Sequence, residues 1–105
     1  MYIGLNAVGK GSFIVHPGFV GIDSWVHIGE NCTVLPMVLF GRAHPIDGTE
    51  IFVGDNCYVG TGATILGPIR IGNNVTIAAG AVVTKDVPDN VVVAGVPAII
   101  VKYKN

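Results

Sequence analysis

Small aliphatic residues recur at every sixth position through the second half of the chain, and another apolar or small residue lies two places before each of them. The same frame occurs in the first half. Such alternation over three residues is what a short strand with one buried face requires. The recurring positions are Val53, Val59, Ile65, Ile71, Ile77 and Val83, preceded by Ile51, Cys57, Ala63, Ile69, Val75 and Ala81, and earlier Ile22, Ile28, Val34 and Phe40, preceded by Val20, Val26, Cys32 and Val38.

A period of six fits neither a helix nor a hairpin protein. A helix needs apolar residues at i, i+3, i+4 and i+7, and hairpin strands alternate over longer runs. Here turn residues follow each apolar pair, as in Gly54-Asp55-Asn56 and Gly72-Asn73-Asn74. Short strands joined by tight turns of fixed length are typical of a solenoid. We therefore predict an all-β fold, a parallel β-helix with three strands per coil and about five coils of roughly 18 residues.

Two segments depart from the repeat. Phe40 and Val53 are thirteen residues apart, one more than two repeats, which predicts a bulge or short loop over residues 41–50. Loops that interrupt a solenoid often carry function. Residues 87–105 also leave the frame, and we expect them to cap the last coil or to pack on a neighbouring subunit. The chain length favours one domain over residues 1–105.

The composition indicates that part of the surface is covered by other subunits. The chain is 50% hydrophobic but only 12% charged, whereas about 25% charged residues is usual, so we expect identical subunits to cover part of the surface. The net charge of −1 argues against a nucleic-acid partner. The sequence has neither a signal peptide nor an apolar run of membrane length, so we expect a cytoplasmic protein without membrane insertion. Cys32 and Cys57 are expected in the core, in different strand columns.

The repeat also resembles a known family. The stretches IFVGDNCYVGTGATILGPIRIGNNVTIAAGAVVTKDVPDN and VVVAGVPAIIVK are similar to the C-terminal part of hexapeptide-repeat acetyltransferases. GKGSFIVHPG with IGENCTVL resembles the serine acetyltransferase branch, and AHPID resembles the galactoside and maltose acetyltransferase branch. The resemblance implies a left-handed coil, an exception to the usual right-handed crossover. It also implies a homotrimer with active sites between subunits, acetyl-CoA as donor, a small-molecule hydroxyl acceptor and no metal.

Two histidines are candidates for the general base that this chemistry needs. The unperturbed pKa of histidine, about 6.5, suits that task. His16 matches the catalytic histidine of the serine branch, and His44 matches that of the galactoside branch. Strand alternation with Val15 inside would turn His16 outward, whereas counting in sixes from Ile22 would turn it inward. Which histidine acts as base stays open.

The acceptor is expected to be a sugar or a polysaccharide precursor rather than L-serine. The serine branch has an aspartate just before its catalytic histidine, and this chain has Val15 there. The partner that would orient the imidazole is therefore missing from that position. By resemblance, Arg42 contacts the acceptor. His27 lies between the in-frame Val26 and Ile28 and should point outward, either as a packing residue or toward the acceptor.

The residues expected to bind acetyl-CoA follow from the resemblance alone. Small residues would line the path of the pantetheine arm, and later polar residues would meet the nucleotide phosphates, for which a lysine ammonium is suited. Simple solvation is the alternative for the lysines. The expected set is Gly62, Ala79 and Gly80 for the arm, and Thr84, Lys85 and Lys102 for the phosphates.

Three other functions are kept as alternatives. The first is a serine acetyltransferase. The second is a γ-type carbonic anhydrase, a zinc protein of the same fold that needs three histidines; its resemblance is weaker because the histidine spacings here are 11 and 17 residues. The third is a non-catalytic trimeric scaffold, since the chain lacks the N-terminal segment of the acetyltransferases.

Overall fold

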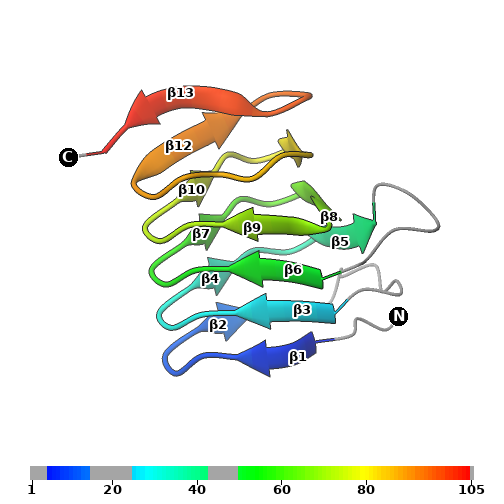
Figure 1. The fold of residues 1–105 in the computed structure, drawn as a ribbon, viewed down its shortest axis with the longest axis vertical. Coiled ribbons are helices and arrows are strands. Elements are labelled where there is room, and N and C mark those ends of the chain that lie inside the picture. The colour runs from blue at the N-terminus through cyan, green and yellow to red at the C-terminus, as the bar shows by residue number, and fades with distance from the viewer. Residues whose placement is uncertain (1–4, 15–24, 43–49, 105) are drawn as a thin grey trace.

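The chain winds into a coil of short strands stacked from β1 at one end to β13 at the other (Figure 1). The computed structural model describes residues 5–14, 25–42 and 50–104. All regular secondary structure within these residues is β-strand. The strands are β1 (Leu5–Val8), β2 (Phe13–Ile14), β3 (Trp25–Ile28), β4 (Thr33–Val34), β5 (Leu39–Arg42), β6 (Glu50–Val53), β7 (Tyr58–Val59), β8 (Thr64–Gly67), β9 (Ile69–Ile71), β10 (Thr76–Ile77), β11 (Val82–Val83), β12 (Val91–Ala94) and β13 (Ile99–Tyr103).

These strands form three sheets that are the walls of the coil. The first sheet has the order β1-β3-β6-β9, the second β13-β12-β10-β7-β4-β2 and the third β11-β8-β5. Neighbouring strands are parallel except for β12 and β13. Strands that neighbour one another in a sheet belong to successive coils, so the predicted parallel β-helix is confirmed.

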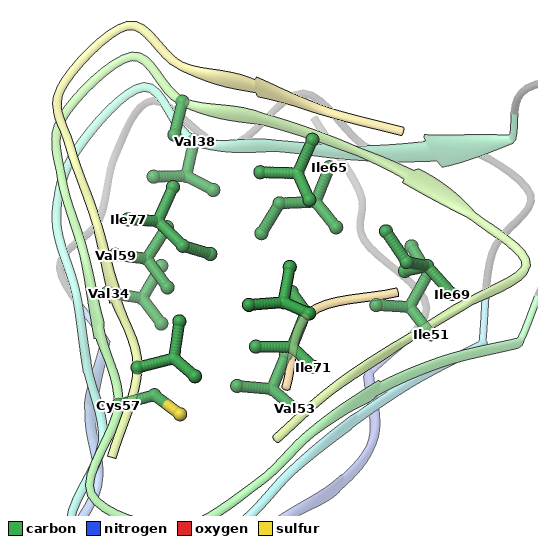
Figure 2. Close-up of a cluster of buried hydrophobic side chains, with 14 of the residues drawn as sticks. Val34, Val38, Ile51, Val53, Cys57, Val59, Ile65, Ile69, Ile71 and Ile77 are labelled. Atoms are coloured by element: carbon green, nitrogen blue, oxygen red, sulfur yellow. The ribbon is translucent and has the colours of Figure 1, made fainter. Parts of the chain in front are cut away.

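The interior holds the residues that the six-residue period selected. Every recurring position from Ile51 to Val83, and from Val26 to Phe40, is at most 4% exposed. Figure 2 shows side chains from the three walls pointing toward one another, with Val34, Val59 and Ile77 stacked on one wall and Ile51 and Ile69 on another. Like side chains thus lie above one another in columns, an arrangement that suits close packing in a narrow interior.

Asparagine or aspartate follows β6, β9 and the bridge residue Val87, and its side chain joins successive coils. In each of these turns a side-chain oxygen accepts a hydrogen bond from a backbone N–H of the coil before it. The next residue in each turn is an asparagine in the left-handed region, with φ between 56° and 60°, which asparagine tolerates better than most residues. The bonds are Glu30 N to Asp55 Oδ1, Asp55 N to Asn73 Oδ1, and Asn73 N to Asp89 Oδ1.

The interruption after β5 is larger than the sequence suggested. Phe40 pairs with Ile65, yet thirteen residues lead from Phe40 to Val53 whereas six lead from Ile65 to Ile71. The coil therefore holds seven extra residues at this point, rather than one. The boundaries 41–50 also shift, because β5 continues to Arg42 and β6 begins at Glu50.

The same miscount displaced the cysteines. They were expected in different columns, but Thr33 pairs with Tyr58, which puts Cys32 and Cys57 in the same column of the second sheet. The expectation that both are core residues is correct, since they are 1% and 2% exposed.

The C-terminal segment is only partly a cap. Val87 still bridges to Ile71 of the first sheet, and β12 continues the second sheet in parallel. Only β13 leaves the coil, pairing antiparallel with β12 along the top of the stack (Figure 1). All five residues of β13 are exposed. In the part of the chain that the structure describes, no helix is long and apolar enough to cross a bilayer.

Truncating a buried column residue should destabilise the coil in proportion to the volume removed. Ile77 is fully buried, so Ile77→Val should lower the free energy of unfolding by about 1 kcal/mol and Ile77→Ala by about 2–5 kcal/mol. Urea unfolding followed by circular dichroism measures both. Thr84→Ala, at an exposed position after β11, is the control and should change stability by less than about 0.5 kcal/mol. Equal effects of the three variants would contradict the packing described.

Candidate functional site

The two candidate bases lie outside the described residues. His16 follows the end of β2 by two residues, and His44 follows the end of β5 by two residues. Ile14, the last described residue of β2, pairs with Val34 of β4. Arg42 ends β5 and pairs with Gly67.

Three residues expected to bind the donor come together at one corner of the coil. The turns that lead from the second sheet to the third lie above one another; we call Pro36–Met37, Thr61–Gly62 and Ala79–Gly80 the turn column. Gly62 N donates to Pro36 O at 3.1 Å, and Gly80 N donates to Thr61 O at 3.0 Å. The structure thus places Gly62, Ala79 and Gly80 along one edge.

The outer side of the turn column is open. A Cβ atom on Gly62 or Gly80 would meet no atom within 4 Å, and both have a φ of +73°, a region that disfavours other residues. In contrast, a Cβ on Gly60 would lie 2.5 Å from Ala79 N. Gly60 thus permits the close stacking of the turns, while Gly62 and Gly80 leave backbone accessible to a ligand.

The polar residues expected near the phosphates lie on two sides of the top coil. Thr84 and Lys85 follow β11 of the third sheet and are exposed. Lys85 lines a cavity of about 230 Å³ whose other walls include Ile99 and Ile100. Lys102 is exposed on β13, where it pairs with Val92 in the second sheet, and is not among the residues that line this cavity. The three residues are near the same end of the coil but do not form a single cluster.

His27 lies on another face. Its ring stacks on Phe52 with 4.5 Å between centroids and 9° between planes, and its Nε2 lies 3.2 Å from Glu50 Oε1. Arg70 covers Phe52 at 4.6 Å, so the three side chains follow one another up β3, β6 and β9. They border a groove of about 360 Å³.

The stack of His27, Phe52 and Arg70 supports the interpretation of His27 as a packing residue. Both faces of Phe52 are already covered, and the contact with the half-exposed Glu50 carboxylate contributes little stability at such a surface. Because the first sheet is a different wall from the turn column, one chain does not bring His27 together with Gly62, Ala79 and Gly80. Among the described residues, no three His, Cys, Asp or Glu side chains are grouped so as to hold a metal ion.

The cysteines have structural contacts. The Cys32 thiol donates to Gly54 O at 3.0 Å, and the Cys57 thiol donates to Gly72 O at 3.1 Å. The hydrogen bond with Cys32 and then burial raise the pKa of the Cys57 thiol above its usual value. The Cys57 thiol therefore stays protonated inside the core and is a poor nucleophile.

Met37 is a turn-column residue that was not among the expected site residues; it has a φ of +67° and is 60% exposed. Aligning the repeats VLPMV, VGTGA and IAAGA would have found it, because methionine stands there in place of Gly62 and Gly80.

Both cysteines should resist thiol reagents in the folded protein. Because each is at most 2% exposed, a dithionitrobenzoate assay under native conditions should release far less than one thiol equivalent per chain within minutes. The same assay in guanidinium chloride should release both. Rapid stoichiometric reaction of the native protein would contradict the described burial.

Comparisons with known proteins agree with this geometry. The bacterial transferase hexapeptide family (six repeats) matches residues 50–85. The serine acetyltransferase of Mycobacterium tuberculosis is 40% identical over 91 residues, which are 86% of this chain and 40% of that protein.

Two solved structures extend the likeness to almost the whole chain. A serine acetyltransferase from Brucella abortus in complex with coenzyme A has a TM-score of 0.86 and 36% identity over 97% of this chain and 41% of its own. A maltose O-acetyltransferase from Clostridium difficile has a TM-score of 0.85 and 33% identity over 97% of this chain and 60% of its own. The chain thus spans about 40–60% of the length of these relatives. By its repeat, its three parallel sheets and these relatives, the chain belongs to the hexapeptide-repeat acetyltransferase family of left-handed parallel β-helices.

Proposed function

We propose that this chain is an acetyl-CoA-dependent O-acetyltransferase that transfers acetyl to the hydroxyl of a small molecule. The observation that carries this proposal is the likeness, over 97% of the chain, to a serine acetyltransferase whose structure contains coenzyme A. The turn column supports it, because this corner has the open glycine backbone that a narrow, extended pantetheine arm needs.

The donor would lie along the turn column with its phosphates toward the top of the coil. Gly62, Ala79 and Gly80 would border the arm. Thr84, Lys85 and Lys102 are exposed at the upper end, where ammonium groups would neutralise phosphate charge. Acetyl-CoA supplies an activated acyl group, and this arrangement needs no metal ion to polarise it.

His16 and His44 remain the candidate bases. One of them would take the proton from the acceptor hydroxyl, whose oxygen then attacks the thioester carbonyl carbon. When the tetrahedral intermediate collapses, the carbon–sulfur bond breaks and the leaving thiolate takes up the proton.

L-serine is now the better-supported acceptor. Serine acetyltransferases recur among the relatives, from Mycobacterium tuberculosis and Brucella abortus, so the comparisons favour this alternative over the sugar expected from the sequence. The sugar remains the second candidate, because Val15 replaces the expected aspartate and because the maltose O-acetyltransferase is an equally close structural match.

The site would be completed in a homotrimer. The turn column lies on an open corner of the coil, so a neighbouring subunit would have to bring acceptor-binding residues to the donor. The zinc-enzyme alternative is less well supported, because the relatives named above are acetyltransferases.

Replacing each candidate base tests the proposed mechanism. His16→Ala or His44→Ala, whichever removes the base, should lower kcat about a hundredfold or more. Thiol release from acetyl-CoA with L-serine or maltose as acceptor measures this. His27→Ala is the matched control and should retain most of the rate. Full activity in both variants would exclude a histidine base, and no transfer or CoA binding by the wild type would favour the scaffold alternative.

Replacing the lysines tests the orientation of the donor. Lys85→Ala and Lys102→Ala should each raise the KM for acetyl-CoA several-fold with little change in kcat, because each loses one phosphate contact. The difference in KM between each variant and the wild type should shrink at high salt, where exposed charges are screened. Lys10→Ala, on an exposed turn of the first coil, is the control. An unchanged KM in both variants would argue against phosphates at the upper end.

A further inference from the structure

We infer that Met37 is a specificity residue that limits the length of the acyl group, by forming the lower wall of the donor path. This inference rests on the proposed function and adds to it a residue that separates acetyl-CoA from longer acyl-CoA thioesters.

Met37 occupies the same place in its coil as two glycines in the coils above. Val34, Val59 and Ile77 pair in register across β4, β7 and β10. The third residue after each of them is Met37, Gly62 and Gly80, with φ values of 67°, 73° and 73°. Pro36 O accepts hydrogen bonds from Gly62 N and from Thr61 Oγ1, the latter at 2.6 Å. The Met37 turn therefore lies directly below the Gly62 turn.

This position is the only one of the three that carries a side chain. Nothing lies within 4 Å of the Cβ direction at Gly62 or Gly80, whereas the Met37 side chain is 60% exposed and stands out from the corner. Because coils are about 4.8 Å apart, an open path along two glycines ends at a thioether one coil below Gly62. Methionine is disfavoured at positive φ, where glycine would be accommodated without strain.

The direction of the donor places the acyl group at this end. Met37 lies two residues before β5 of the third sheet. Lys85 follows β11, which lies two coils higher in the same sheet. With the phosphates at the upper end, the thioester lies toward Met37. The flexible, apolar methionine side chain is then suited to contact the acyl methyl group.

Calorimetric titration of the whole chain with CoA, acetyl-CoA and butyryl-CoA tests this without an acceptor. In Met37→Gly the ratio of butyryl-CoA to acetyl-CoA affinity should rise roughly tenfold over wild type, because two added methylenes gain room. Affinity for CoA itself should not change. The variant should fold normally, since glycine suits this backbone, and thermal unfolding checks that.

Asn56→Gly is the matched control. Asn56 is exposed, has a φ of 58° and lies at the corner that follows the first sheet. Asn56→Gly therefore also replaces a side chain at positive φ by glycine, but away from the turn column. An affinity ratio that changes in Met37→Gly alone supports the inference. An unchanged affinity ratio in Met37→Gly, or the same rise of the ratio in Asn56→Gly, overturns the inference about Met37. In that case, binding of acetyl-CoA by the wild type still supports the proposed function. No binding of CoA or acetyl-CoA by the wild type overturns both.

Discussion

The structure depends on the requirement that each coil stack in register on the one below it. Backbone hydrogen bonds run between coils, as from Thr33 N to Cys57 O and from Tyr58 N to Val75 O, both 2.9 Å. The same register lines up the inward side chains in columns. A buried backbone group that lost its neighbour in the next coil would be left unpaired at considerable cost. The walls therefore tolerate little variation in length or in side-chain size.

Variation is consequently confined to the corners. The register of β8 on β5 is intact although seven extra residues follow β5, because they come between the last strand of one wall and the first strand of the next. The turn column shows the same principle on a smaller scale. Its backbone conformation is constant in three successive coils, while the side chain changes from methionine to glycine. Differences in function can thus be placed at corners without changing how the coils pack.

A convex coil also separates its outward residues onto different faces. His27 stacks with Phe52 and Arg70 on the first sheet, Lys102 lies on the edge strand of the second, and Lys85 follows the third. One such prism provides open surfaces rather than a deep cleft. A site that combines groups from more than one face needs another surface opposite it, which is the physical reason why the proposed function includes a homotrimer.

The sequence by itself determined the repeat, the parallel coil and the core positions from Val26 to Phe40 and from Ile51 to Val83, because burial in a coil with three short walls imposes a period of six on the side chains. It also indicated that Cys32 and Cys57 are core residues. Tertiary structure decided the register between coils, which a count in sixes cannot give once extra residues enter at a corner. That register put the two cysteines in one column, placed Ile14 beside Val34, and showed that Met37 shares a corner with Gly62 and Gly80. Residues 25 positions apart became neighbours only because the chain stacked.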